Sequence, residues 1–340
     1  MENTTSTSTS KCVISYYGLN CTKMEFSKSE SALIVGVMSF FIATTILSNL
    51  LIISAVAFFR QLQTRTNTLA LSLAVSDLLV GVVIMPLAMV KAVYKCWFYV
   101  QWFCNVQFFC DYWFTTASVL HLSCIAYDRY VAICDPLRYA QRVTRRTLTF
   151  MLLFCWIVSA IISTPILLSM SPTLAKGRIE MVGCPNDCRF LISVGILFTI
   201  GMVPYFTSVL LIMLMYGRIY QVARSQARKI GTQSHGLPGV ASETTSRWTN
   251  MKREHNATKT LGSIIAAFII SWLPFYILAI VFTMYQDIFL PYKISFWIGY
   301  MNSTINPILY AVFNKQFRHA FKTMLSFKVF SSAARDKEMN

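Results

Sequence analysis

Seven long apolar blocks are the feature that most limits how this 340-residue chain can fold. A helix that crosses a bilayer needs roughly 20 mostly apolar residues, because each residue adds about 1.5 Å along the axis. The blocks fall at residues 32–58, 67–92, 102–134, 147–170, 190–217, 258–284 and 294–313. The alternating pattern of a membrane β-barrel is absent, so the sequence predicts an all-α membrane protein with a seven-transmembrane helix bundle.

The charge of the chain indicates how this bundle is oriented. Only 13% of the residues are charged, yet the net charge is +16 because 30 Lys and Arg outnumber 14 Asp and Glu. The Lys and Arg residues are concentrated in one set of loops. The positive-inside rule places those loops in the cytoplasm and the N-terminus outside a plasma membrane that the chain crosses several times. Anionic lipid headgroups account for the basic charge, so we expect membrane lipid and no nucleic acid as a partner.

The chain is expected to form one domain with polar ends. Residues 1–31 are rich in Ser and Thr and contain the N-glycosylation acceptors Asn3 and Asn20, which suits an extracellular segment. The first apolar block begins too late and is too long for a cleavable signal peptide. Residues 32–313 form the predicted transmembrane domain, with a third cytoplasmic loop at about 224–253.

Residues 314–340 are expected to form an amphipathic helix and a cytoplasmic tail. Phe313, Phe317 and Phe321 recur every four residues between basic residues, which places the aromatic rings on one helical face. Such a helix lies on the membrane surface after the seventh span.

Asp111 is the most informative of three acidic residues inside the spans, where charge is costly and usually functional. It precedes Arg129 by 18 residues, or five helical turns, so both share one face about 27 Å apart. With Arg129 at the cytoplasmic surface, Asp111 lies in the outer third of the membrane. A buried anion without an evident protein cation favours a cationic ligand, and the alternative is a protonated, neutral Asp111.

The predicted ligand pocket combines this carboxylate with polar and aromatic side chains. Aromatic faces attract an ammonium group through their quadrupoles and exclude water from it. The expected ligand-binding residues are Asp111, Tyr112, Thr115, Trp272, Phe275, Tyr276, Trp297 and Tyr300, together with Asp187 in the second outer loop. A diamine ligand would need a second carboxylate, for which the outer end offers Asp187, Glu180 and Asp287.

Asp77 lies in the middle of the second span, at a depth where other spans carry neutral oxygen donors. A carboxylate surrounded by such oxygens suits a small hard cation. The sequence therefore predicts an allosteric sodium ion held by Asp77, Ser118, Asn302 and Ser303, and it predicts no other cofactor. The alternative is a hydrogen-bonded polar cluster that fixes helix packing.

A third group of residues suggests a conformational switch. The third span ends with Asp128, Arg129 and Tyr130, and Glu254 lies at the start of the sixth. Because Arg129 can pair with both Asp128 and Glu254, it can hold the two helices together. The alternative is an ion pair that only reaches the lipid headgroups. Proline kinks at Pro274 and Pro307 supply hinges. The predicted switch set is Asp128, Arg129, Tyr130, Glu254, Pro274, Asn306, Pro307 and Tyr310.

Together these motifs resemble the rhodopsin-like family of G-protein-coupled receptors over residues 32–322. The resemblance rests on motifs in the family's order and spacing: Asn49, Asp77 in LSLAVSDLLVG, Asp128-Arg129-Tyr130, Trp156, Pro204, SWLPF and Asn306-Pro307-Ile308-Leu309-Tyr310. It implies ligand-dependent activation of a heterotrimeric G protein.

Asp111 matches the amine-binding aspartate of aminergic receptors, and within that group the chain is most similar to trace amine-associated receptors. This resemblance rests on Cys96-Trp97, Asp135-Pro136-Leu137-Arg138-Tyr139, Lys259-Thr260-Leu261-Gly262, Asn302-Ser303-Thr304 and the outer-loop motif from Cys184 to Cys188. It implies a chemosensory or olfactory receptor for a small amine or diamine that raises cyclic AMP through a stimulatory G protein. The segment AVFNKQFRHAF after Tyr310 instead resembles serotonin-type receptors, so a serotonin-like receptor is the alternative.

The same resemblance implies two disulfides on the outer side. We expect Cys104 to bridge to Cys188, and Cys184 to bridge to the N-terminus through Cys21 in preference to Cys12. The distance to Pro204 also allows Cys184 as the partner of Cys104.

Other functional classes find little support. The seventh span has Tyr300 where a photoreceptor needs its lysine, and no internal repeat indicates a transporter. No nucleophile with a base, metal-ligand cluster or phosphate-binding loop indicates an enzyme. An amine scavenger that does not signal remains an alternative, which G-protein recruitment would separate from a receptor.

Overall fold

The computed structural model describes residues 12–14, 19–21, 27–94, 101–169, 197–233, 262–281 and 289–326. The long helices in this part of the chain are α1 (Lys28–Phe58), α2 (Arg65–Leu79), α3 (Met85–Tyr94), α4 (Gln101–Cys134), α6 (Arg145–Ser169), α8 (Val203–Gln233), the helix Gly262–Val281, α10 (Phe289–Phe313) and α11 (Lys315–Leu325). Short elements link them: strands β1 (Cys12–Ile14) and β2 (Leu19–Cys21), 3₁₀ turns η1 (Arg60–Leu62) and η3 (Pro136–Arg138), π turns η2 (Val80–Ile84) and η4 (Leu197–Met202), and helix α5 (Tyr139–Arg142).

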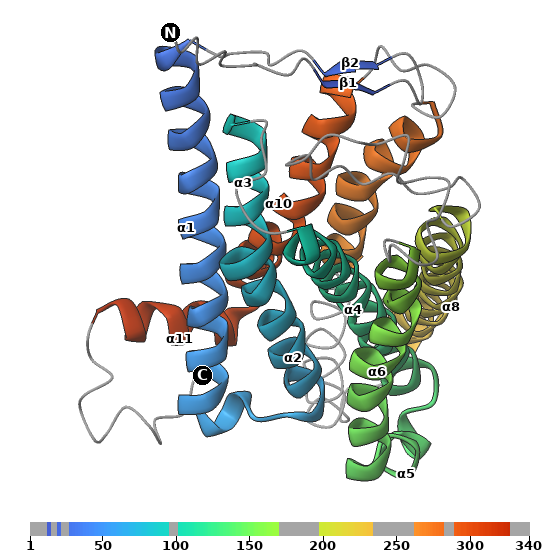
Figure 1. Cartoon of the computed structure of the whole chain (residues 1–340). Coiled ribbons are helices and arrows are strands. Elements are labelled where there is room, and N and C mark those ends of the chain that lie inside the picture. Colours follow the sequence, from blue (N-terminus) through green and yellow to red (C-terminus); the bar gives the residue numbers. More distant parts are fainter. Residues whose placement is uncertain are drawn as a thin grey trace, which may run out of the picture.

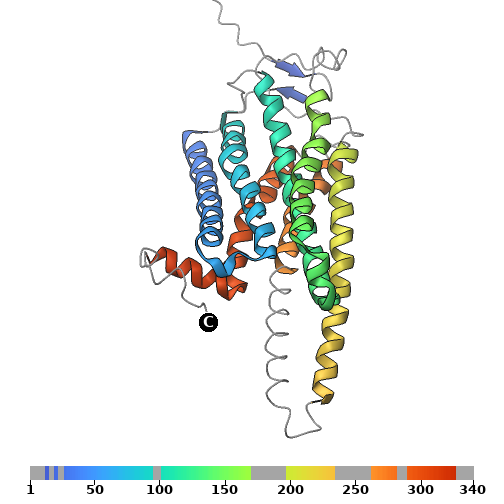
Figure 2. The same ribbon diagram turned by 90° about the horizontal axis from the view of Figure 1, so that it is seen from below.

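The long helices pack side by side as the predicted bundle (Figures 1 and 2). Five described segments are long and apolar enough to cross a membrane: Lys28–Phe58, Arg65–Val93, Arg145–Leu167, Phe198–Val222 and Gly262–Val281. Helices α4 and α10 complete the bundle and carry many of its buried polar side chains. Their polarity follows from their place inside the bundle, where they face other helices more than lipid.

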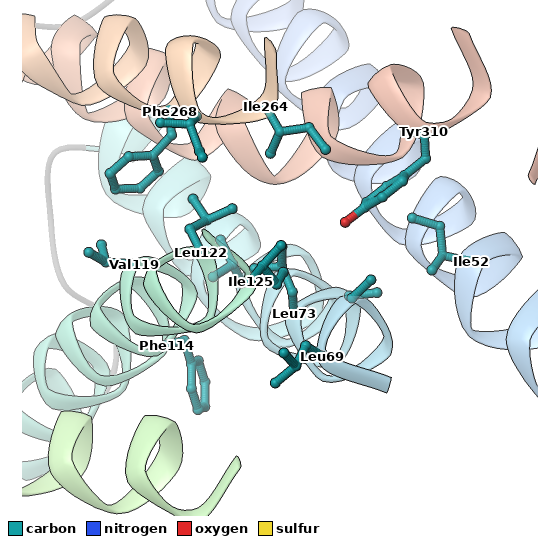
Figure 3. Close-up of a cluster of buried hydrophobic side chains, with 14 of the residues drawn as sticks. Ile52, Leu69, Leu73, Phe114, Val119, Leu122, Ile125, Ile264, Phe268 and Tyr310 are labelled. Carbon is teal, nitrogen blue, oxygen red and sulfur yellow. The ribbon is translucent and has the colours of Figure 1, made fainter. Parts of the chain in front are cut away.

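The core lies where α4 meets its neighbours. Helix α4 packs against α2, α6 and α8, while α1 packs against α2 and α10. Figure 3 shows Leu122 and Ile125 of α4 directed toward the region that Leu73 and Phe268 also enter. All four side chains are at most 1% exposed. Because lipid is as apolar as these side chains, close van der Waals packing stabilises the contact more than expulsion of water does.

Two π turns interrupt the regular helices, and the sequence did not predict them. In the second span, η2 joins α2 to α3, and a Cβ added at Gly81 would lie 3.0 Å from the Thr45 side chain of α1. Glycine therefore lets the two helices approach closely at this level. In the fifth span, η4 ends just before Pro204, which has no N–H for the helical bond to the carbonyl of Ile200.

Helix α11 confirms the predicted amphipathic helix and extends it to Leu325. The Asn314 side chain caps it by accepting hydrogen bonds from the backbone N–H groups of Gln316 and Phe317, at 3.0 and 3.4 Å. Phe317 and Phe321 are buried, and the Phe317 ring lies 5.1 Å from that of Tyr310. Figures 1 and 2 show α11 running across the base of the bundle, as a helix on the membrane surface does.

Two features differ from the expected organisation. Helix α8 continues to Gln233, past residue 224, where we expected the third cytoplasmic loop to begin. The all-α prediction also omitted the small antiparallel hairpin of β1 and β2, in which Cys12 lies opposite Cys21. Figure 1 shows this hairpin at the end of the bundle where α1 begins, which we call the outer end.

Candidate functional site

The Asp111 carboxylate lies inside the bundle, bridged to a second helix. Its side chain on α4 is 6% exposed, and the Tyr300 hydroxyl of α10 donates a 2.6 Å hydrogen bond to Oδ2. Tyr300 is itself 4% exposed, so water is kept from this bond. Among the described residues, none donates a hydrogen bond to Oδ1. The carboxylate is thus oriented by one phenol and keeps an oxygen for another donor.

A pocket opens beside this carboxylate and encloses about 550 Å³ of atom-free space, its open mouth included. Helices α4, α8, α10 and Gly262–Val281 contribute its walls together with η4. The lining residues are Asp111, Tyr112, Thr115, Thr116, Val119, Leu120, Ile200, Gly201, Pro204, Tyr205, Ser208, Phe268, Trp272, Phe275, Tyr276 and Phe296. An apolar and aromatic wall with one carboxylate matches the usual build of a small-molecule site.

The aromatic residues of the pocket contact one another in a continuous group. Trp272 meets Phe275 edge to face at 5.7 Å between ring centroids, and Tyr205 lies 4.3 Å from Tyr276. Phe275 also packs against Phe296 of α10 at 4.3 Å. Interlocked rings hold each other in place and present faces that attract a cation.

Trp272 at the base of this group depends on a glycine. A Cβ added at Gly299 of α10 would lie 2.9 Å from two carbon atoms of the Trp272 indole. The indole also meets the Tyr300 ring edge to face at 6.4 Å. The absence of a side chain at Gly299 therefore allows Trp272 to lie against α10 beside the partner of Asp111.

Most of the predicted ligand-binding residues come together in this structure. Asp111, Tyr112, Thr115, Trp272, Phe275 and Tyr276 line the pocket, and Tyr300 contacts it through its bond to Asp111. Trp297 lies behind Tyr300, with 5.9 Å between the rings, and is not part of the lining. The hydroxyl of Thr115 donates to the backbone carbonyl of Asp111 at 2.7 Å, so its proton is used within α4. Asp187 lies outside the described residues.

Sequence reasoning missed the contribution of the fifth span. Among the residues shortly before Pro204, Thr199 is polar, but it is exposed and does not line the pocket. The pocket instead receives Tyr205 and Ser208, which follow that proline, and Ser208 is 6% exposed. Ser208 lies one helical turn after Pro204 on the same face, and this spacing is the signal that could have identified it.

The Asp77 cluster lies deeper in the bundle and joins three helices. Asp77 of α2 is fully buried, and its Oδ1 accepts hydrogen bonds from Ser303 at 2.8 Å and Ser118 at 3.4 Å. Its Oδ2 accepts one from the Asn306 amide at 2.8 Å. The expected contacts with Ser118 and Ser303 are therefore present. Asn302 makes no hydrogen bond to Asp77, whereas Asn306, which lies at the same depth but was not among the predicted ion ligands, does.

The residues around Asp77 fit a small hard cation. The side-chain oxygens of Asn49, Asn302 and Asn306 are buried and accept no hydrogen bond within the described part of the chain. Unpaired buried oxygens are costly, and together with a carboxylate they are the ligands that hard cations prefer. No cluster of three His, Cys, Asp or Glu residues that would suit a transition metal occurs among the described residues.

The predicted switch is present in part. Asp128 is fully buried and accepts hydrogen bonds from Arg129 at 2.5 and 3.0 Å, from Thr66 at 2.6 Å and from Tyr139 at 2.9 Å. Arg129 also donates to the Thr66 hydroxyl. Arg129 is thus held on its own helix and on α2. Glu254 lies outside the described residues, so its pairing with Arg129 stays a prediction.

The remaining switch residues lie where the predicted spans place them. Pro307 falls inside α10, and Pro274 falls inside the helix Gly262–Val281. Tyr310 is 4% exposed, and its hydroxyl makes no hydrogen bond with a described residue. Tyr130 follows Arg129 in α4 and is partly buried.

The described cysteines differ in whether they form a disulfide. Cys104 is buried and disulfide-bonded, as predicted, while Cys184 and Cys188 lie outside the described residues. The partner of Cys104 therefore stays a prediction, as does the partner of Cys21 in β2. The thiols of α4 and α6 are free: Cys110, Cys124, Cys134 and Cys155. Of the glycosylation acceptors, Asn20 lies in β2 and Asn3 is outside the described residues.

Comparison with known proteins agrees with this geometry. The family model described as "7 transmembrane receptor (rhodopsin family)" matches residues 48–310, which include the buried acids Asp77, Asp111 and Asp128 and the whole pocket. The fold and site thus define a seven-transmembrane receptor that couples a small-molecule site to a G protein.

The chain is also similar to individual receptors along most of its length. It is 42% identical to trace amine-associated receptor 365 of Petromyzon marinus over 330 residues, covering 96% of this chain and 89% of that receptor. It is 35% identical to trace amine-associated receptor 1 of Macaca mulatta, covering 92% and 93%, and 33% identical to receptor 8b of Rattus norvegicus, covering 91% of each. The chain therefore belongs to the rhodopsin family of G-protein-coupled receptors and, within it, to the trace amine-associated receptor type.

Proposed function

We propose that this receptor is activated by a small cationic amine whose ammonium group pairs with Asp111. The observation that carries the proposal is a buried carboxylate, oriented by Tyr300 on one oxygen, beside a pocket walled by aromatic rings. An ammonium group that leaves water must regain charge and hydrogen bonds, and a carboxylate is its strongest partner. Trp272, Phe275 and Tyr276 add cation–π attraction and exclude water from the pair.

The signalling role follows from the receptor type. The names of the similar receptors refer to trace amines, which supports a ligand of the trace amine type over the serotonin-like alternative. We infer a chemosensory receptor that activates a stimulatory G protein and raises cyclic AMP. Arg138, Arg142 and Arg145 lie at the end of the bundle opposite the hairpin, which supports a cytoplasmic location for that end and an extracellular N-terminus in the plasma membrane.

An allosteric sodium ion is part of this proposal. Asp77, Ser118 and Ser303 would hold it, with the unpaired amide oxygen of Asn302 as a further ligand. Its stabilising effect would appear as a higher temperature of unfolding in sodium chloride than in potassium chloride at equal ionic strength. Asp77→Asn should remove that difference, and an equal response of the wild type to both salts would contradict the ion site.

The test of the proposed function is the response of Asp111→Asn to amines. Loss of one partner from a buried charge pair costs about 3–5 kcal/mol, so the potency of the best agonist should fall by two to three orders of magnitude. The measurement is a cyclic-AMP dose–response curve at equal surface density of wild type and variant. Asp111→Glu, which keeps the charge, is the matched control and should retain part of the response. A shift of less than about threefold for Asp111→Asn would mean that the amine binds elsewhere.

A further inference from the structure

Lys91 is a charged residue of the second span that the sequence analysis left without a role. It lies in α3, and its Nζ is 4.0 Å from the centroid of the Phe108 ring on α4. Phe108 precedes Asp111 by three residues, which is about one helical turn toward the outer end. Lys91 also attracts the Asp111 carboxylate electrostatically. The binding carboxylate therefore has a cation about one turn above it, a cation that sequence reasoning did not consider.

Gln107 supplies a second polar group at the same level. Its side chain is 3% exposed, and its Oε1 accepts no hydrogen bond from any described residue. A buried amide oxygen that lacks a partner costs free energy unless water or a ligand completes it. Either its oxygen or its nitrogen can face that partner, because the two ends of the amide are interchangeable by rotation.

Helical geometry places both groups beside Asp111. Gln107 is four residues before Asp111, and Phe108 is three residues before it. Viewed down the axis of α4, their side chains therefore point about 40° and 60° away from the direction of Asp111, one on each side of it. The Asp111 face of α4 therefore runs outward between Gln107 and the ring under Lys91. A ligand whose ammonium group is paired with Asp111 and whose chain extends outward along α4 would bring its far end to these two side chains.

The charge of Lys91 decides which far end is favoured. A second ammonium group would meet a like charge in a setting that water screens poorly, which opposes binding. A carboxylate would gain a charge-assisted hydrogen bond from Lys91 and a further hydrogen bond from Gln107. An uncharged alkyl end would neither form these hydrogen bonds nor be repelled by Lys91.

We propose that Lys91 and Gln107 form a second subsite that selects amines with an anionic far end, such as ω-amino acids, over diamines. This inference rests on the proposed function, because it takes the ammonium group of the ligand to be paired with Asp111. It makes Lys91 a specificity-determining residue and opposes the diamine reading, in which Asp187 would bind a second ammonium group.

Three ligands with the same number of carbon atoms test the subsite: 5-aminopentanoate, n-pentylamine and 1,5-diaminopentane. They differ only in the far end, which is an anion, a methyl group or a second cation. On the wild type, we expect 5-aminopentanoate to be more potent than 1,5-diaminopentane by at least about tenfold, with n-pentylamine between them. Cyclic-AMP dose–response curves at matched surface density provide the potencies, and the response to n-pentylamine reports on folding and on the Asp111 site.

Variants of Lys91 separate its charge from its packing. Lys91→Met should bring the three potencies to within about threefold of one another, Lys91→Glu should reverse the order in favour of the diamine, and Lys91→Arg should preserve it. Gln107→Leu should weaken 5-aminopentanoate and leave n-pentylamine within about threefold.

The outcomes distinguish this inference from the proposed function. An unchanged order in Lys91→Met or Lys91→Glu, with n-pentylamine still dependent on Asp111, would overturn the subsite and leave the amine receptor intact. The same holds if 5-aminopentanoate is inactive on the wild type while other amines act. If no amine of any class acts, the proposed function fails and the subsite fails with it.

Discussion

Asp77 and Asp111 are both buried carboxylates in the membrane, yet their surroundings are opposite. Asp77 accepts hydrogen bonds from three neutral side chains on two other helices, Ser118, Ser303 and Asn306. Asp111 accepts one, from Tyr300, and borders a pocket. The residue type alone thus does not determine the role of a buried acid. The number of donors that the protein itself supplies distinguishes Asp77, which is tied into the packing of three helices, from Asp111, which keeps a carboxylate oxygen of its own for another donor.

The two acids are nevertheless connected through α10. Tyr300 bonds to Asp111 and Ser303 bonds to Asp77, and only three residues, or about 4.5 Å of helix rise, separate them. Any rotation or shift of α10 that changes one contact therefore changes the other. This short distance offers a physical route from the ligand to the interior of the bundle, since both contacts bias the position of one rigid element.

The largest effect should be the difference in folding stability between two variants, Asp77→Leu and Asp111→Leu. Asp77→Leu leaves three buried donors without an acceptor at about 1–3 kcal/mol each, so it should abolish most surface expression. Asp111→Leu leaves only the Tyr300 hydroxyl unpaired and should remain folded. Surface immunolabelling and thermal unfolding in detergent provide the measurement. Equal expression of both variants would remove the distinction between the two sites.

A smaller effect should come from filling the space at Gly299, which lies one turn before Ser303. The added methyl group of Gly299→Ala would overlap the Trp272 indole and displace it, at a cost of about 1–3 kcal/mol. Because Trp272 lines the pocket, amine potency should fall together with the temperature of unfolding. Gly36→Ala is the matched control, since no atom lies within 4 Å of its added Cβ. If the two alanine variants behave alike, Gly299 does not set the position of Trp272.

The smallest effect should come from Tyr300→Phe, which removes the donor to Asp111 and keeps the ring. Loss of one hydrogen bond to a charged group corresponds to about 1.5–3 kcal/mol, much of which the ammonium group can recover by using the freed oxygen. We therefore expect a fall in potency of about three- to tenfold with folding unchanged. If the potency on Tyr300→Phe falls as far as on Asp111→Asn, the freed carboxylate oxygen does not let the ammonium group compensate for the lost Tyr300 hydroxyl.

The fold was predictable because its signals are local. Apolar blocks of membrane length indicated the spans, and the four-residue spacing of Phe317 and Phe321 indicated α11. Phe313, which we expected on the same face, instead ends α10 and is exposed. The 18-residue separation between Asp111 and Arg129 holds because both lie in the single helix α4. Charge inside a span identified the acids, since a charged side chain is costly in a membrane and is usually kept there for function.

The details of the site were less predictable because they depend on how helices face one another. Ser208 and Phe296 enter the pocket through rotations of α8 and α10 that no motif encodes. Asn306 instead of Asn302 bonds to Asp77 for the same reason. Lys91 carried a signal, a charge inside a predicted span, but its proximity to Asp111 depends on the packing of α3 against α4.

The π turn η2 divides the second span into two segments with different rotational phase. A π turn holds about one residue more than an α-helical path of the same rise, which rotates everything beyond it by roughly 100°. Asp77 precedes the turn and Lys91 follows it, so the extra residue sets the angle between the Asp77 cluster and the proposed subsite. Deleting one residue there, such as the half-exposed Val82, would turn Lys91 away from Phe108 without altering any residue of the pocket. Ligand selectivity in this receptor can thus change through the length of a helix as well as through the identity of its side chains.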